Sequence, residues 1–279
     1  MFITVQYGNP ADTETFLESL ASLEDTDTCQ VVIVDNPAKD AAPASSLQKT
    51  YPMPVQRVGA PTNLYYWGGA AFAIEAIRRS NNALPRWLVI CNNDVQIGQV
   101  DFLKRLGKID AIQFPIVAPA VTSLASHRDQ NPMLPGPPGF LKRLKWRMYD
   151  VAYPVAVAML FAHRVLKRPD GGRRPGDAGA RRKIHAPHGA FVILSSTFFE
   201  RGGSLDTQVP LFAEELTLAE TARQLGLPIW YFPDLHVNHA EHSTTGAELT
   251  RAKYSLERLA RRRYYHLRRN SSVRHETGN

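Results

Sequence analysis

The stretch Trp87-Leu88-Val89-Ile90-Cys91-Asn92-Asn93-Asp94 joins an apolar run to three side chains that carry oxygen ligands. A short apolar run bounded by polar residues is typical of a strand that is buried on both faces of a parallel sheet. Mg²⁺ and Mn²⁺ prefer oxygen ligands and usually share them with substrate phosphates. The stretch therefore predicts a buried strand that ends at a site for a cation and a phosphorylated substrate. The alternative is that Asn93 and Asp94 only close a turn.

Strand-like and helix-like patterns alternate around this stretch, which indicates an α/β fold with a mostly parallel central sheet and helices on its faces. Three more strands are predicted at residues 3–7, 31–34 and 55–58. Asp12 is a predicted N-cap for the helix that follows the first strand. Another helix is predicted from Ala70 onward, directly after the glycine pair Gly68-Gly69.

The alternation returns in the second half of the chain. Strands are predicted within residues 188–194 and 229–232, and the helix between them reaches from the Glu214-Glu215 pair to Gly226. The alternation is interrupted at residues 123–184 and ends near residue 245, so we divide the chain into four parts. We expect two halves of one domain at residues 1–122 and 185–245, a basic and partly apolar insertion at 123–184, and a basic amphipathic helix and tail at 246–279.

Composition bounds the class of protein. The chain has 279 residues, of which 44% are hydrophobic, so it can bury a full core and is not a disordered protein. Its two cysteines, Cys29 and Cys91, lie in or beside apolar runs and predict neither a disulfide framework nor a cysteine-based zinc site. No signal-peptide pattern precedes the first strand-like run, so we expect a cytoplasmic protein.

Positive charge is concentrated in two segments of the chain, whose net charge is +7. Residues 142–183 hold 12 Lys and Arg against 3 Asp and Glu, and residues 251–269 hold 8 against 1. Apolar and aromatic residues are interleaved with the basic ones in residues 141–168, and the helix from Leu249 onward is basic and amphipathic. Both patterns are typical of elements that lie on an anionic membrane surface. The alternatives are a solvated basic tail and an ordinary helical hairpin packed on the domain.

Polar groups follow two of the predicted strands and begin one predicted helix. Ligands of open α/β sheets bind beyond the carboxyl ends of the strands, so Asp35-Asn36 and Asn92-Asn93-Asp94 are expected to converge. The order of the motifs resembles that of a family 2 glycosyltransferase, of the bacterial polysaccharide and rhamnosyltransferase-like branch. The resemblance rests on Val31–Asn36, Asn63, Gly68-Gly69, Leu88–Asp94, His188–Phe191, Leu205-Asp206, Phe212–Glu215 and His239.

The resemblance implies a GT-A (Rossmann-like) fold and the transfer of a sugar, with inversion, from a nucleotide-diphosphate donor to a hydroxyl of a glycan or polyprenyl-linked acceptor. By similarity, Asp35 contacts the donor base. A carboxylate can accept the imino hydrogen of a pyrimidine, which favours UDP or dTDP; the alternative for Asp35 is a helix N-cap. The other donor-binding residues that the resemblance implies are Asn36, Asn63, Gly68, Gly69, Asn92 and Asn93.

The resemblance also implies a metal site for Mn²⁺ or Mg²⁺. Asp94 matches the last acid of the Asp-x-Asp signature of the family and is the implied ligand. Asn92 stands where the first acid is expected, and the loss of that charge weakens the site. His239 takes the place of a further metal or diphosphate ligand, although a lone histidine after a strand is often structural.

Two acids and a His-Gly pair complete the implied site. An inverting transfer needs a carboxylate that takes the proton of the acceptor hydroxyl, and Glu215 is the predicted base, with Glu214 as the alternative. The two acids can also simply complement the dipole of the helix that they begin. His188 and Gly189 are expected on the acceptor side, where His188 can instead cap a turn.

Other classes of protein explain fewer of these features. A sugar-nucleotide nucleotidyltransferase would grip a triphosphate with a glycine-rich basic loop, which the stretch Tyr7-Gly8-Asn9-Pro10 does not supply. A nucleic-acid-binding protein leaves the acidic motifs unexplained, and no His-Glu-x-x-His motif supports a metal hydrolase. We therefore expect a transferase of cell-surface polysaccharide or lipopolysaccharide synthesis, attached peripherally to the inner face of the plasma membrane.

Overall fold

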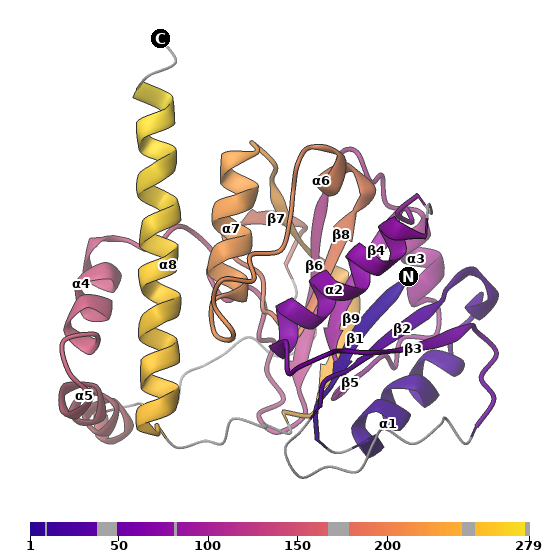
Figure 1. Ribbon diagram of the computed structural model, residues 1–279, viewed down its shortest axis with the longest axis horizontal. Helices are drawn as coiled ribbons and strands as arrows, with labels where there is room; N and C mark the ends of the chain where they lie inside the picture. Colours follow the sequence, from indigo (N-terminus) through magenta and orange to yellow (C-terminus); the bar gives the residue numbers. More distant parts are fainter. Residues whose placement is uncertain (9, 38–48, 81–82, 167–178, 242–248, 277–279) are drawn as a thin grey trace.

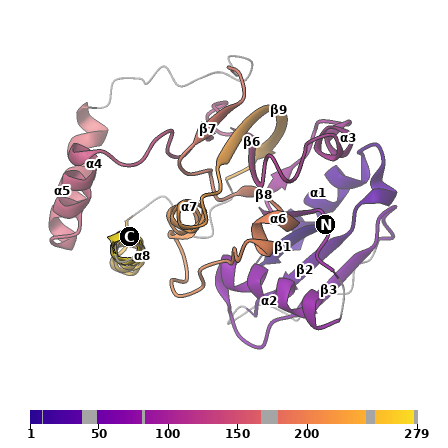
Figure 2. The same cartoon turned by 90° about the horizontal axis from the view of Figure 1, so that it is seen from above.

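The computed structural model describes residues 1–8, 10–37, 49–80, 83–166, 179–241 and 249–276. Parts of the predicted insertion and of the predicted tail therefore lie outside the described residues. The described chain forms one nine-stranded sheet with helices on both faces, as Figures 1 and 2 show. The predicted α/β fold with a mostly parallel central sheet is confirmed.

The first half of the sheet is parallel throughout. Its strands are β1 (Phe2–Gln6), β2 (Val31–Asp35), β3 (Val55–Gly59) and β4 (Trp87–Asn92). β1 pairs with both β2 and β4, and β2 pairs with β3. Parallel strands end at the same edge of a sheet, so the residues that follow β2 and β4 lie at one edge.

The second half of the sheet is mixed. Its strands are β5 (Val95–Gln96), β6 (Ile116–Ser123), β7 (Arg182–Ile184), β8 (Phe191–Ser195) and β9 (Ile229–His239). β8 runs antiparallel between β4 and β6, and β9 runs parallel to β6. The short strands β5 and β7 both pair antiparallel with β9. The order across the sheet is β3-β2-β1-β4-β8-β6-β9-β5, and β7 pairs with β9 outside this path.

Six helical elements flank the sheet. They are α1 (Pro10–Ala21), the 3₁₀ helix Thr26–Thr28, α2 (Tyr65–Arg79), α3 (Phe102–Gly107), α6 (Ser196–Glu200) and α7 (Glu214–Gln224). α1 and α3 cover one face, whereas α2, α6 and α7 cover the other (Figure 2).

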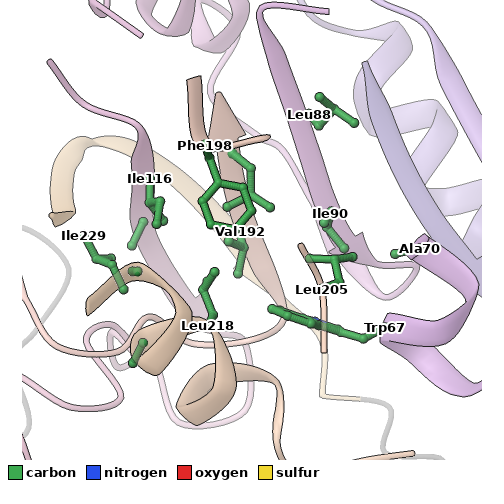
Figure 3. Packing of buried hydrophobic residues seen from close by; sticks show 14 of the residues in the cluster. Trp67, Ala70, Leu88, Ile90, Ile116, Val192, Phe198, Leu205, Leu218 and Ile229 are labelled. Atoms are coloured by element: carbon green, nitrogen blue, oxygen red, sulfur yellow. The ribbon is translucent and has the colours of Figure 1, made fainter. Parts of the chain in front are cut away.

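Alternation along β1 explains how one strand serves both cores. Ile3 and Val5 pack with residues of α2, including Trp67 and Ala70, and Phe2 packs on the other face with Phe16 of α1. Successive side chains of a strand point to opposite faces, and the helices bury both. Figure 3 shows the first core, in which Leu88, Ile90, Val192 and Ile116 of the sheet meet residues of α2, α6 and α7.

Two predicted helix starts are wrong. α1 begins at Pro10, so Asp12 lies inside the first turn and not at the N-cap. Proline suits a first helical position because its φ is preset and its missing N–H needs no partner there. α2 begins at Tyr65, so Gly68 and Gly69 lie within the helix and do not precede it.

Gly69 has a packing reason for its place in α2. A Cβ atom at this position would lie 2.8 Å from Cγ2 and 3.1 Å from Cγ1 of Val5 on β1. No other residue lets the helix lie this close to the strand without displacing it. The glycine therefore sets the distance between α2 and the sheet.

In its described residues, the predicted insertion holds the strand β7 and two helices. Residues 182–184 form β7 and belong to the sheet. The helices are α4 (Phe140–Tyr149) and α5 (Tyr153–Leu166). Both lie on the far side of α8 (Arg251–Glu276) from the sheet in Figures 1 and 2, and α8 packs against α7.

Candidate active site

The register of two strands brings Asp94 and His239 together. β5 follows Asp94 directly and pairs with the end of β9, where Val95 lies opposite His239. The backbone N–H of Ala240 donates to the carbonyl of Asp94 at 3.0 Å. As a result, Nε2 of His239 lies 3.3 Å from Oδ1 of Asp94, and both side chains are nearly buried.

A chain of hydrogen bonds fixes the tautomer of His239. The side-chain amide of Gln130 donates to the carboxylate of Glu241, which also accepts a hydrogen bond of 2.8 Å from the Ser123 hydroxyl. The Gln130 Oε1 atom then accepts from Nδ1 of His239 at 2.8 Å. In the tautomer of a neutral imidazole that carries its hydrogen on Nδ1, the lone pair of Nε2 would face Asp94.

The facing pair is suited to a cation. Oδ1 of Asp94 is buried without a hydrogen-bond partner in the described part of the chain, and the nearest ring nitrogen is also an acceptor. Two buried acceptors that face each other are unfavourable unless a cation or a proton satisfies both. A carboxylate and an imidazole with a hydrogen-bonded second nitrogen form a common ligand set for Mn²⁺.

The metal site would have two protein ligands. No group of three or more His, Cys, Asp and Glu residues that could hold a metal ion occurs among the described residues. Magnesium-type sites often use only one or two carboxylates, and substrate phosphates and waters complete the coordination. The pair Asp94 and His239 therefore fits a metal that binds together with a diphosphate.

His188 lies beside this pair. Its ring centroid is 5.7 Å from that of His239, and its Nδ1 accepts from the backbone N–H of Ala190 at 3.2 Å. Burial and, to a smaller extent, the neighbouring His239 lower the pKa of His188 to about 4, against the opposing effect of Asp94. His188 is therefore a neutral side chain at neutral pH, with its hydrogen on Nε2.

Glu214 and Glu215 are the first two residues of α7. Oε1 of Glu215 accepts the backbone N–H of Gly189 at 3.2 Å, and a Cβ atom on Gly189 would lie 2.8 Å from that same oxygen. Only glycine leaves room for this carboxylate. Burial raises the pKa of Glu215, although its hydrogen bonds to backbone N–H groups oppose the rise.

Glu214 lies deeper than its neighbour. It is 8% exposed, and burial together with the charge of Glu215 raises its pKa to about 8. Backbone N–H groups of residues 212–214 donate to its carboxylate and oppose the rise. Two acids of unequal burial share the start of one helix, and a raised pKa suits a group that exchanges a proton near neutral pH.

Tyr66 links the two acidic groups of the site, and the sequence analysis does not single it out. Its hydroxyl donates to the carbonyl of Gly189 at 2.9 Å. Burial raises the pKa of Tyr66 well above its usual value, and the carboxylates of Glu214, Glu215 and Asp94 add to the rise. The phenol therefore lies within electrostatic reach of all three acids.

The pKa of Glu214 gives a testable dependence of stability on pH. An acid whose pKa rises on folding destabilises the native state as the pH rises from its unfolded value of 4.5 toward its folded value of about 8. At pH 9, Glu214→Gln is therefore expected to have a higher Tm than the wild type, because its free energy of unfolding is larger by on the order of a few kcal/mol. At pH 4 the two proteins are expected to have similar Tm values. Thermal unfolding of both proteins at the two pH values measures the difference. A difference that is independent of pH would contradict the raised pKa.

Asp35 lies at the carboxyl end of β2 and is paired with Arg57 of β3. Nε of Arg57 donates to Oδ2 of Asp35 at 2.9 Å, and the guanidinium also contacts Oδ1. The same guanidinium donates to Oε1 of Gln6 at 3.1 Å. Both Asp35 and Arg57 keep part of their surface exposed, so the pair offers an acceptor and a donor side by side to a ligand.

Three of the predicted donor-binding residues have structural contacts. The amide of Asn36 accepts from the Leu64 N–H at 3.1 Å and donates to the Tyr65 carbonyl at 3.0 Å. Oδ1 of Asn63 accepts the Tyr65 N–H at 2.9 Å, and the amide of Asn93 donates to the Thr13 hydroxyl on α1 at 3.0 Å. The contacts of Asn36 and Asn63 hold the start of α2, where the first residue, Tyr65, has a positive φ of 58°. The contact of Asn93 positions the end of β4.

The predicted site residues thus fall into two groups. The structure brings together Asp94, His188, Gly189, Glu214, Glu215 and His239, with Tyr66 between them. Asp35 lies apart from these residues on β2 and faces Arg57. Asn92 ends β4, and its backbone N–H donates to the Ala190 carbonyl at 2.9 Å. Gly68 and Gly69 serve the packing of α2.

No protein-family model matches the chain, and a search of curated proteins found no match. Solved structures do resemble it. S. aureus TarS 1-349 has a TM-score of 0.53 at 12% identity, over 86% of this chain and 60% of that chain. GalNAc-T7 with UDP, GalNAc and Mn²⁺ has a TM-score of 0.53 at 11% identity, over 86% of this chain and 43% of that chain. TarS 1-349 in complex with UDP-GlcNAc has a TM-score of 0.52 at 12% identity, over 93% of this chain and 64% of that chain.

The chain spans less than two thirds of the length of these structures, with shares of 60%, 43% and 64%. At 11 to 12% identity the likeness concerns the fold and not the residues of the site. The protein has the α/β fold of the GT-A glycosyltransferases.

Proposed function

We propose that this protein is an inverting glycosyltransferase that moves a sugar from a nucleotide-diphosphate donor to a hydroxyl of a glycan or polyprenyl-linked acceptor. The observation that carries the proposal is the buried pair of acceptors, Nε2 of His239 and Oδ1 of Asp94, 3.3 Å apart. It lies in reach of a second acidic group at the start of α7. One group suits the donor diphosphate and its metal, and the other suits the proton of the acceptor.

The reaction needs one bond to form and one to break. The acceptor oxygen bonds to the anomeric carbon from the face opposite the diphosphate, and the bond from that carbon to the diphosphate oxygen breaks. The hydroxyl proton passes to the Glu215 carboxylate, which has Gly189 N–H as its partner on Oε1. The diphosphate leaves with the bonding electrons.

The donor end of the site would combine two metal ligands with two residues that bind the base of the nucleotide. Asp94 and His239 would hold Mn²⁺ or Mg²⁺, which supplies positive charge to the leaving diphosphate. Asp35 would accept the imino hydrogen of a uracil or thymine ring, and Arg57 beside it would donate to a ring carbonyl. Residues 1–122 then form the donor half of the domain and residues 185–245 the acceptor half.

A polyprenyl-linked acceptor would require the protein to reach a membrane. The described residues contain no helix that is long and apolar enough to cross one. We propose peripheral attachment to the inner face of the plasma membrane through α4, α5 and α8. The support is the exposure of apolar side chains on α4 and α5 beside many basic residues.

The function is tested by ligand-induced stabilisation. A ligand that binds the native state raises stability by RT ln(1 + [L]/Kd). We expect UDP or dTDP to raise the Tm in the presence of Mn²⁺ and to have a smaller effect in EDTA. ADP in the same buffer is the matched control for the base. Nucleotide release from UDP-, dTDP- and GDP-sugars then identifies the donor. The absence of a shift with any nucleoside diphosphate would contradict the proposal.

A further inference from the structure

One face of α4 is apolar and exposed. Phe140 is 69% exposed, Leu141 78%, Leu144 43% and Met148 50%. Their spacing along the helix places them on one side, with Lys145 and Arg147 at the two edges of the stripe. A soluble surface seldom leaves such a continuous apolar face uncovered.

The opposite face of α4 fixes the direction of this stripe. The ring of Trp146 packs edge-on against Tyr264 of α8 at 6.1 Å. Tyr149 donates to Glu257 at 2.8 Å, and Asp150, just past the helix, pairs with Arg261 at 2.6 Å. α4 is therefore held on α8 by aromatic, hydrogen-bonded and ionic contacts, and its apolar stripe faces away from the domain.

α5 extends the apolar surface. Val157 is 41% exposed, Leu160 38% and Phe161 69%. No Asp, Glu, Lys or Arg occurs from Tyr153 to Ala162, and of the side chains that the structure describes in this span only Ala156 is buried. α4 and α5 both lie on the outer side of α8 (Figure 2), and each exposes apolar side chains.

A basic pocket adjoins this surface between α4 and α8. Its cavity volume is about 500 Å³. Five arginines line it, namely Arg147 of α4 and Arg258, Arg262, Arg268 and Arg269 of α8. Asp150 is the one acid of the lining and already pairs with Arg261. The pocket therefore holds a large excess of positive charge.

Two donors that line the pocket have no protein acceptor. The Tyr265 hydroxyl and Nε of Arg258 are buried and make no hydrogen bond within the described residues. A guanidinium stays protonated and can only donate, so the arginines of the lining favour a bound anion. Phosphate oxygens are the acceptors that an arginine cluster binds best, because the planar guanidinium matches two of them at once.

The charge of α4 and α5 limits the kind of partner that can cover their exposed side chains. Neither helix contains an acidic residue in its described side chains, and α4 contains four basic ones. A second copy docked by a two-fold axis would bring these basic residues against each other. Nucleic acid would neutralise the arginines but would leave the apolar stripe in water. An anionic bilayer can meet both features at once.

We infer that the pocket between α4 and α8 binds the phosphate of an anionic phospholipid headgroup while the exposed side chains of α4 and α5 enter the acyl region. The inference rests on the peripheral attachment in the proposed function and adds to it a defined headgroup site. Arg147 joins the two features, because it borders the apolar stripe and also lines the pocket. Lipid phosphate at this site would hold α8, and the domain behind it, at a fixed height above the membrane.

Binding to vesicles of phosphatidylglycerol tests the site with the full chain and without any sugar donor. We expect Tyr265→Phe, which keeps the charge, to weaken partition several-fold. The triple variant R147Q/R262Q/R269Q is expected to weaken it by about 10-fold or more, as is the apolar pair L141S/F161S. The matched control K104Q/K108Q/R201Q removes the same charge from exposed positions elsewhere and is expected to change partition by less than about twofold. Each variant is first checked for an unchanged Tm.

The outcomes separate the inference from its rivals. If the pocket and control triple variants lose vesicle binding equally and Tyr265→Phe has no effect, the headgroup site is overturned. General electrostatic attraction would then explain the binding. Saturable binding of inorganic phosphate alone at the same pocket, without vesicle binding, would assign it to a soluble anion. A dimer that L141S/F161S converts to a monomer would assign the apolar face to a second copy. Nucleotide binding that persists while vesicle binding is absent would overturn this inference and leave the transferase proposal intact.

Discussion

Replacing Asp94 with asparagine is expected to remove sugar transfer and to leave the fold intact. Oδ1 of Asp94 has no hydrogen-bond partner in the described part of the chain, and its one ionic contact there is with His239. The new amide can donate to Nε2 of His239, which lies 3.3 Å from the oxygen it replaces. We therefore expect a Tm equal to or above that of the wild type, together with a fall in turnover of about two to three orders of magnitude.

Metal affinity provides the second readout. Without the carboxylate, the pair loses its only anionic ligand, so Mn²⁺ is expected to bind more weakly in the presence of UDP, as titration calorimetry can measure. Asp101→Asn is the matched control, because Asp101 pairs with Arg105 on an exposed helix and lies outside the site. Wild-type turnover in Asp94→Asn, or an equal loss in Asp101→Asn, would remove Asp94 from the reaction.

The sequence predicts the edge of the sheet where the site lies, because local patterns carry that information. Apolar runs that end in Asp35 and in Asn92–Asp94 identify parallel strands and their carboxyl ends. Such local patterns do not predict the contact between Asp94 and His239. It depends on the antiparallel register between β5, a strand of two residues, and the end of β9. No local pattern specifies a register between segments so distant in the chain.

The residues that the sequence analysis missed act through long-range contacts. Gln130 reaches His239 because residues 128–130 fold back along the end of β6, where Thr122 bridges to Asp129. Tyr66 meets Gly189 across the sheet. A glutamine in a loop and one of two adjacent tyrosines carry no signal of their own.

The errors in secondary structure have local physical causes. Glycine is unfavourable in a helix, so a glycine pair predicts a helix start. In α2 the close approach of Gly69 to Val5 outweighs that cost. No strand is predicted at residues 116–123, where β6 lies, and Pro119 interrupts the apolar run. The structure accommodates this proline at a register shift of the β6–β9 pair, as proline in a sheet requires.

Replacing Glu215 with glutamine is expected to lower turnover by about 100-fold to 10,000-fold, the usual contribution of a general base. Oε1 of this carboxylate accepts the N–H of Gly189, and Glu215 as a residue is only partly buried. Glu214 is more deeply buried and has backbone N–H partners from residues 212–214. We therefore expect Glu214→Gln to lower turnover by less than about 10-fold, and Kd for UDP to stay within about twofold in both variants.

The dependence of rate on pH separates the base from a merely structural acid. A base acts only when it is deprotonated, so turnover of the wild type is expected to fall as the pH drops through the raised pKa of Glu215. Glu215→Gln lacks this group, so its residual turnover is expected to stay constant as the pH drops over the same range. The charge of Glu215 raises the pKa of Glu214, so Glu215 ionises first and Glu214→Gln is expected to keep the fall in rate at low pH. If the fall in turnover at low pH disappears in Glu214→Gln and persists in Glu215→Gln, the base is Glu214. The acceptor hydroxyl would then have to approach the more buried of the two carboxylates.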